Sequence, residues 1–157
     1  MLYLYMALKA LHVLAVVVFV GNIITGVFWK VHADLTGELR ARAQALAGLI
    51  KADRLFTLPG VLLIVATGVS MVLMSHLSFF GTPWILWPIV LFTISGLAFA
   101  VKVAPLQKRM LANVEAGITG SWDRDAYDAM SRGWTVWGTV ATLAPVAAIF
   151  VMVMKPS

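Results

Sequence analysis

Four long apolar segments dominate the pattern of hydrophobic and polar positions along the chain. They cover about residues 4–29, 55–74, 84–104 and 134–154, and crossing a bilayer as a helix takes roughly 20 apolar residues. Continuous apolar runs of this length do not alternate as barrel strands must, and a helix satisfies its own backbone hydrogen bonds in lipid. The pattern therefore predicts an all-α fold, a four-helix transmembrane bundle made by a single integral membrane domain over residues 1–157.

The segments between the spans also have helical periodicity. Apolar residues recur at helical spacing over residues 35–50, with basic residues between them. This indicates an amphipathic helix that lies on the membrane surface or extends span two. A weaker pattern of the same kind covers residues 106–118, and residues 117–121 have the composition of a turn. We interpret Asp123, Asp125 and Asp128, which follow, as part of a solvated loop.

Composition agrees with a membrane protein and narrows the chemistry. The chain is 61% hydrophobic and 12% charged, with a mean hydropathy of +0.92, whereas soluble domains carry roughly 25% charged residues. It has no cysteine, which excludes disulfides, thiolate metal sites and cysteine nucleophiles. We found no glycine motif that binds phosphates or dinucleotides. The net charge of +5 comes from basic residues beside the spans, so we predict no nucleic-acid partner.

The distribution of lysine and arginine predicts the orientation of the chain. Ten of them lie in or beside the two long segments that join spans one and two and spans three and four, whereas Lys9 and Lys155 lie near the chain ends. Because loops rich in lysine and arginine stay in the cytoplasm, both termini are predicted outside. The expected location is the bacterial plasma (inner) membrane, as a multi-pass protein. Its expected partners are the lipid bilayer and either a second copy of the chain or another membrane protein.

His12 is the most distinctive polar residue within a predicted span. Polar groups are costly in lipid when unpaired, so they are candidates for function. Imidazole is a common axial ligand of haem, and the small residues Ala15, Gly21 and Gly26 would admit a neighbouring helix or a flat cofactor. The alternative, which we favour, is a histidine that is hydrogen-bonded to a neighbouring helix.

The other polar residues do not complete a site around His12. His32 lies just past span one at the opposite surface, and His76 ends span two, so the paired histidines of a four-helix cytochrome b are missing. No aspartate or glutamate lies within a predicted span, which disfavours a proton-driven transporter. We identify no catalytic residue set, and no metal site other than haem iron at His12.

Several short motifs are similar to those of known families. They are residues 9–16 (KALHVLAV) with Gly21, residues 29–34 (WKVHAD), residues 54–55 (RL), residues 67–68 (TG) and residues 153–156 (VMKP). This layout resembles a family of predicted bacterial integral membrane proteins of unknown function and, more distantly, the membrane-bound, haem-containing protoporphyrinogen oxidase family. The second resemblance implies a haem b bound through His12. It also implies a lysine early in span three, where this chain instead has residues 84–88 (WILWP).

Three functional hypotheses follow from the sequence. The first, which we favour, is an integral membrane protein of the uncharacterised family without an assigned activity. The second is a haem-b-binding membrane oxidoreductase related to protoporphyrinogen oxidase, which acts on a porphyrin or a quinone-like substrate with His12 on the iron. The third is a structural or assembly subunit of a larger membrane complex.

Overall fold

Helices make up the regular structure of the described residues, 2–156, in a computed structural model of the chain. No strand occurs within them. In chain order the elements are α1 (Leu2–Thr36), α2 (Leu39–Ala52), the π-helix η1 (Asp53–Thr57), α3 (Leu58–Met74), α4 (Pro83–Ala98), the π-helix η2 (Phe99–Val103), α5 (Ala104–Ile118) and α6 (Arg124–Met154).

The elements join into four continuous helices, each apolar enough to cross a membrane. Helix α1 has 35 residues, α2–η1–α3 (Leu39–Met74) and α4–η2–α5 (Pro83–Ile118) have 36 each, and α6 has 31. At 1.5 Å per residue they are about 46–54 Å long, which exceeds the roughly 30 Å hydrocarbon core of a bilayer. The four predicted spans are confirmed as helices, and each helix continues beyond the apolar stretch into the segment that follows or precedes it.

The segments between the spans are more regular than the sequence pattern predicts. The amphipathic segment over residues 35–50 extends span two, which was one of its two predicted arrangements. The interpretation of the acidic segment as a loop is wrong, because α6 begins at Arg124. The Asp123 side chain accepts a hydrogen bond from the Ala126 backbone N–H at 2.9 Å. An N-cap aspartate followed by Asp125 in the first turn stabilises a helix start.

Both π-helices lead into a proline. Leu58 N–H donates to the Asp53 carbonyl at the end of η1, and Ala104 N–H donates to the Phe99 carbonyl at the end of η2. Pro59 or Pro105 comes next in each case. Because proline has no N–H and its ring crowds the carbonyl four residues back, a wider turn before it relieves the clash.

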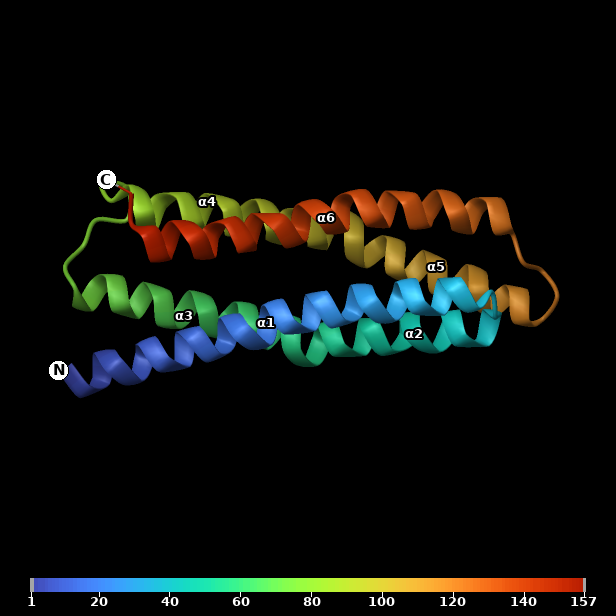
Figure 1. Ribbon diagram of the computed structural model, residues 1–157, viewed down its shortest axis with the longest axis horizontal. Helices are drawn as coiled ribbons and strands as arrows, with labels where there is room; N and C mark the ends of the chain where they lie inside the picture. Colours follow the sequence, from blue (N-terminus) through green and yellow to red (C-terminus); the bar gives the residue numbers. More distant parts are fainter. Residues whose placement is uncertain (1, 157) are drawn as a thin grey trace.

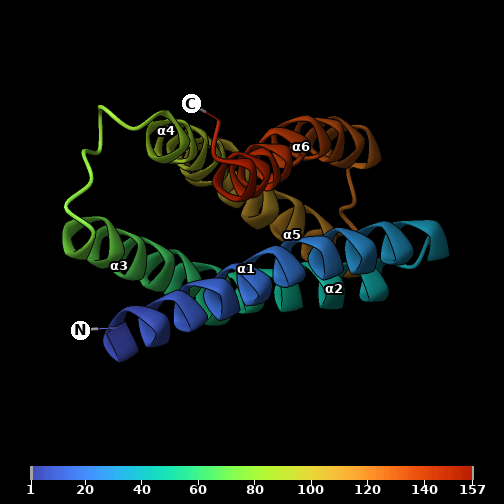
Figure 2. The same ribbon diagram turned by 60° about the vertical axis from the view of Figure 1, so that its left-hand side comes forward.

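The molecule has two unlike ends (Figure 1). Both termini and the link over residues 75–82 lie at one end, here called the terminal end; the α1–α2 and α5–α6 links lie at the other, here called the basic end. In the terminal half, α1 packs on α3 and α4 packs on α6, and the two pairs are separated in both views (Figures 1 and 2). In the basic half, α2 packs on α1 and α5, and α5 packs on α6, so the two pairs are joined there.

The two halves are packed with different residues. The hydrophobic core cluster belongs to the basic half and the middle of the molecule, and it comes from α2, α4, η2, α5 and α6: Leu46, Leu49, Ala98, Val103, Met110, Val114, Tyr127, Trp134 and Ala141. In the terminal half, α1 meets α3 through small residues. A Cβ added at Gly60 would lie 3.4 Å from Phe19 Cβ and 3.8 Å from the Ala15 carbonyl oxygen. Close approach through small residues is the usual way for helices to associate in lipid.

Candidate functional site

A cavity lies where the two helix pairs come together, between the terminal and basic halves. It has a volume of about 190 Å³ and is lined by residues of all four long helices. Its walls are mainly apolar, with Phe19, Val61, Phe92 and Phe99 among them. The rings of Phe19 and Phe92 meet across the gap between the pairs, with centroids 5.6 Å apart.

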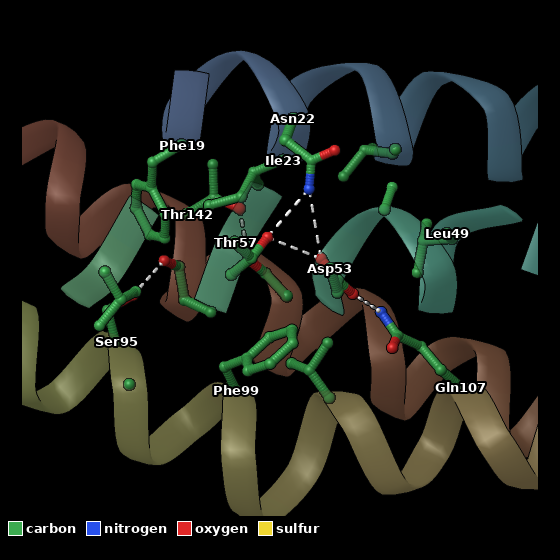
Figure 3. A pocket seen from close by; sticks show the side chains of 18 of the residues that line it. Phe19, Asn22, Ile23, Leu49, Asp53, Thr57, Ser95, Phe99, Gln107 and Thr142 are labelled. Atoms are coloured by element: carbon green, nitrogen blue, oxygen red, sulfur yellow. Dashed lines mark hydrogen bonds between the residues drawn. The ribbon is translucent and has the colours of Figure 1, made fainter. Parts of the chain in front are cut away.

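Four polar side chains form a connected cluster on one wall of this cavity (Figure 3). Thr57 O–H donates to Asp53 Oδ1 at 2.8 Å, and Gln107 Nε2 donates to Asp53 Oδ2 at 3.1 Å. Asn22 Nδ2 donates to Thr57 Oγ1 at 2.9 Å and to Asp53 Oδ1 at 3.4 Å. We call Asn22, Asp53, Thr57 and Gln107 the Asp53 cluster. It ties α1, η1 and α5 together.

The π-helix η1 places two of these side chains. Asp53 is its first residue and Thr57 its last, four positions later. Helix α1 supplies Asn22 from one side and α5 supplies Gln107 from the other (Figure 3). Thr57 and Gln107 are 4% and 3% exposed, so the Thr57 hydroxyl and the Gln107 amide beside Asp53 are held within the protein interior, whereas Asn22 is half-buried. Wide turns of this kind are found often at functional sites.

Asp53 accepts hydrogen bonds from neutral groups alone. None of the ion pairs in residues 2–156 involves it. A carboxyl group that lines an apolar cavity without a cation beside it is a strong acceptor for a further donor. Trp134 lines the same cavity, and its Nε1–H is buried without a hydrogen-bond partner among the described residues. The cavity wall therefore has one acceptor, Asp53, with remaining hydrogen-bonding capacity.

The other hydroxyls on the cavity wall are satisfied by backbone. Ser95 O–H donates to the Ala141 carbonyl at 2.6 Å, and Thr142 O–H donates to the Gly138 carbonyl at 2.7 Å. The first of these bonds holds α4 against α6. The polar chemistry of the cavity is thus concentrated at the Asp53 cluster and Trp134.

His12 lies outside this cavity, in the terminal half. Its Nδ1 is 2.8 Å from Thr67 Oγ1, and its Cε1 would be 3.3 Å from a Cβ added at Gly68. The imidazole therefore packs against α3, and the hydrogen bond to a neighbouring helix that we favoured is present. His32 stacks on Phe28 in the basic half, and His76 lies in the link after α3, with φ of 53°. The structure does not bring the three histidines together.

A second polar cluster joins the helices in the basic half. Lys30 is 2% exposed; its Nζ is 2.6 Å from Asp34 Oδ2, and it donates to Ser131 Oγ. Tyr127 O–H donates to Asp34 Oδ1 at 2.5 Å, and Arg42 Nη2 donates to the Asp34 carbonyl at 3.0 Å. Burial, together with the bond to Asp34, raises the pKa of the Tyr127 hydroxyl. This cluster links α1, α2 and α6 through a buried ion pair and hydrogen bonds, so we assign it to stability.

Sequence reasoning found part of the site. Asn22 and Thr57 are visible as polar residues within apolar spans. Asp53 and Gln107 were missed because they lie two to three residues outside the predicted span boundaries. Lys30 was interpreted as a loop cation, and it is instead buried against α6. The signal that could have located Asp53 is the proline six residues later, at Pro59, which indicates a distorted turn before it.

Four long apolar helices around a buried polar cluster define a multi-pass integral membrane protein. A family model described as "Predicted integral membrane protein (DUF2269)" matches residues 6–156. The chain therefore belongs to the DUF2269 family of predicted integral membrane proteins. Searches of curated proteins and of solved structures gave no match. The predicted resemblance to an uncharacterised membrane protein family is confirmed, and the family description assigns no activity.

Proposed function

We propose that this protein binds a hydroxyl-bearing amphiphile of the membrane, such as a quinol, in the cavity beside the Asp53 cluster. The observation that carries the proposal is the pairing of apolar walls with a carboxyl group, Asp53, that has unused hydrogen-bonding capacity. Binding pockets for small molecules have this composition: mostly apolar, with a few convergent polar groups.

A hydroxyl group matches this polar partner, because it can donate to the Asp53 carboxyl group. A hydrogen bond of this kind contributes about 0.5–1.5 kcal/mol. Asn22 and Gln107 hold Asp53 in place through their amide N–H groups. The same carboxyl group is the proton acceptor that this site offers.

The apolar part of the cavity supports an orientation for the ligand. The apolar cavity residues Val61, Val65 and Phe92 lie on the terminal side of the Asp53 cluster along their helices. An apolar tail would therefore point toward the terminal half. The polar head would meet Asp53 near the boundary of the hydrocarbon core.

The proposal is tested by the thermal stability of the purified protein with a decyl-substituted quinol kept reduced. At a free quinol concentration 100 times the Kd, binding should stabilise the protein by about 2.7 kcal/mol. Asp53→Asn keeps the shape of the side chain and replaces one acceptor oxygen with an amide donor, so quinol binding should weaken about tenfold. Val61→Trp fills the cavity from its apolar wall and should abolish the shift.

The matched control is Thr139→Ala, which removes a hydroxyl from an exposed position of α6 outside the cavity. It should leave the quinol-dependent shift unchanged. Equal shifts in the wild type, Asp53→Asn and Val61→Trp would show that the quinol acts on the micelle or the lipid-facing surface, and would overturn the proposal.

We further propose that the protein is one integral membrane domain of the bacterial plasma membrane, with the basic end in the cytoplasm. The ten-to-two bias of lysine and arginine supports this orientation. A reporter enzyme that works only outside the cytoplasm should be active when it is fused after Ser157. Activity of a cytoplasm-dependent reporter at the same position would contradict it. Self-association and a role as a subunit of a larger complex stay predictions.

Haem binding at His12 is a second proposal, which comes from the sequence resemblance. Its support is a single imidazole whose Nδ1 is oriented by Thr67, because an oriented ring leaves Nε2 for iron. When bound, haem would supply redox chemistry. The absorbance spectrum of the purified protein decides it: one haem per chain, lost in His12→Ala, supports the proposal. Absence of a Soret band after reconstitution with haemin would contradict it.

A further inference from the structure

A second groove lies on the outside of the molecule, between α5 and α6, and it is lined by cations. Its volume is about 360 Å³, and its lining includes Lys102, Pro105, Leu106 and Arg109 from the η2–α5 segment and Gly133 and Trp137 from α6. Lys102 Nζ lies 5.7 Å from the centroid of the Trp137 ring. The groove is separate from the central cavity, which shares none of these residues.

The spacing of Lys102 and Arg109 places both cations on one surface. Lys102 and Arg109 are seven residues apart, which is about two helical turns, so they lie on the same face. Both are exposed, and neither forms an ion pair within residues 2–156. No aspartate or glutamate lines the groove. Two unpaired cations beside an indole ring fit an anionic group such as a phosphate.

The depth of the groove indicates where that phosphate comes from. Lys102 is 18 residues after Trp84 along one continuous helix, which is about 27 Å and places it at the edge of a roughly 30 Å hydrocarbon core. Arg109 lies about 10 Å further along, beyond the headgroup layer, from which its long side chain can reach back. Val101, which also lines the groove, is 63% exposed on the apolar side.

We propose that this groove binds the headgroup phosphate of an anionic phospholipid, with the acyl chains beside Val101. Basic pockets between transmembrane helices recognise anionic lipid headgroups in this way. The proposal does not depend on the ligand of the central cavity. Trp137 fits the same role, because tryptophan prefers the membrane interface.

The test is native mass spectrometry of the purified protein titrated with phosphatidylglycerol. The wild type should retain one lipid more tightly than the rest. Each cation near an anionic surface contributes about a fivefold change in affinity, so Lys102→Gln with Arg109→Gln should weaken this binding on the order of 25-fold. Lys108→Gln is the matched control, since it removes one neighbouring exposed cation that does not line the groove, and it should change the affinity by less than about twofold.

Two further experiments distinguish lipid binding in the groove from general attraction to surface charge and from binding of free phosphate. Gly133→Leu leaves the charge unchanged and places a side chain in the groove. A Cβ at this position would already lie 3.5 Å from Leu106 Cδ1. The variant should therefore also weaken lipid binding. Millimolar inorganic phosphate should not displace the lipid. Equal loss in Lys108→Gln and the double variant, retention in Gly133→Leu, or displacement by inorganic phosphate would each overturn the proposal.

Discussion

The terminal and basic halves of this molecule are both helical, but they are held together by different interactions. The basic half buries large side chains such as Leu46, Met110 and Tyr127, each at most 2% exposed. The terminal half joins α1 to α3 through Gly60 and Gly68 and leaves large apolar residues on the outside. Burial of apolar area stabilises helices against water, whereas in lipid the close approach of small residues takes its place. The terminal half therefore has the kind of packing expected of helices in lipid.

The cavity lies at the boundary between these two modes of packing. The helix pairs that are separated in the terminal half come together there, and the polar groups of the Asp53 cluster begin there (Figure 3). A boundary of this kind offers apolar surface and hydrogen-bonding groups within one side-chain length of each other. This is the environment that an amphiphile has in the bilayer itself.

The largest effect is expected from a core truncation in the basic half. Leu46→Ala, at a position that is 1% exposed, should lower the free energy of unfolding by about 2–5 kcal/mol. Leu62→Ala is the matched control in the terminal half, where the side chain is 71% exposed. It should cost less than about 1 kcal/mol, because lipid solvates leucine before and after unfolding. Titration with SDS in mixed micelles measures the free energy of unfolding of both variants. Equal losses in the two variants would contradict the contrast between the halves.

Loss of the buried cation Lys30 in the basic half should lower the free energy of unfolding slightly less than Leu46→Ala does. Lys30→Met removes the 2.6 Å ion pair of Asp34, leaves it with the longer 3.5 Å pair to Arg42, and leaves Ser131 without its donor. Breaking a buried pair costs about 3–5 kcal/mol, and the lower value applies because the Asp34 side chain is 25% exposed. Arg124→Gln breaks a pair in which the arginine side chain is 74% exposed, and it should cost about 0–1 kcal/mol. Comparable losses in the two variants would contradict a structural role for Lys30.

Replacing a glycine with a larger residue tests the contact between α1 and α3 in the terminal half. Gly60→Leu places side-chain atoms against Phe19 and the Ala15 carbonyl, so it should destabilise the protein by about 1–3 kcal/mol. Gly21→Leu is the matched control, since a Cβ at Gly21 would have no neighbour within 4 Å, and it should be nearly neutral. The apparent Tm in detergent reports both. A neutral Gly60→Leu would mean that α1 and α3 do not pack as described.

The smallest expected effect is a pH dependence of stability, which comes from Tyr127 in the basic half. The pKa of Tyr127 is raised in the folded state by burial and by its bond to Asp34. Its contribution to stability is therefore fully present below the ordinary tyrosine pKa of about 10 and is lost as the pH rises above that value. Tyr127→Phe should cost about 1–2 kcal/mol at pH 7 and should lose less stability than the wild type between pH 9 and 11. Parallel pH profiles would show that Tyr127 does not couple to folding.

Much of the fold could be predicted from hydrophobicity alone. The continuous apolar runs gave four spans, and all four are helices in the structure. The ends of the helices were less predictable, because helices that leave the membrane carry ordinary amphipathic patterns. Asp123 shows the difficulty: the same acidic run that indicates a loop by polarity also caps a helix.

The candidate site was less predictable than the fold. Asn22 and Thr57 are visible in the sequence as polar residues in apolar surroundings, but nothing local pairs them with Gln107, which follows in the chain by 50 positions or more. Asp53 was excluded by a span boundary drawn at Leu55. Such a cluster depends on tertiary contacts and on the π-helix η1, neither of which the 3.6-residue periodicity reports.

The most direct test of the account is photochemical. A photoactivatable fatty alcohol, with its reactive group in the tail, is crosslinked to the protein in membranes, and the adducts are mapped by peptide mass spectrometry. The account predicts adducts on the cavity residues Val61, Val65 and Phe92, lost in Asp53→Asn and competed by the decyl quinol. Adducts confined to lipid-facing residues such as Leu62 and Val136, unchanged in Asp53→Asn, would contradict the claim that this cavity binds a membrane amphiphile.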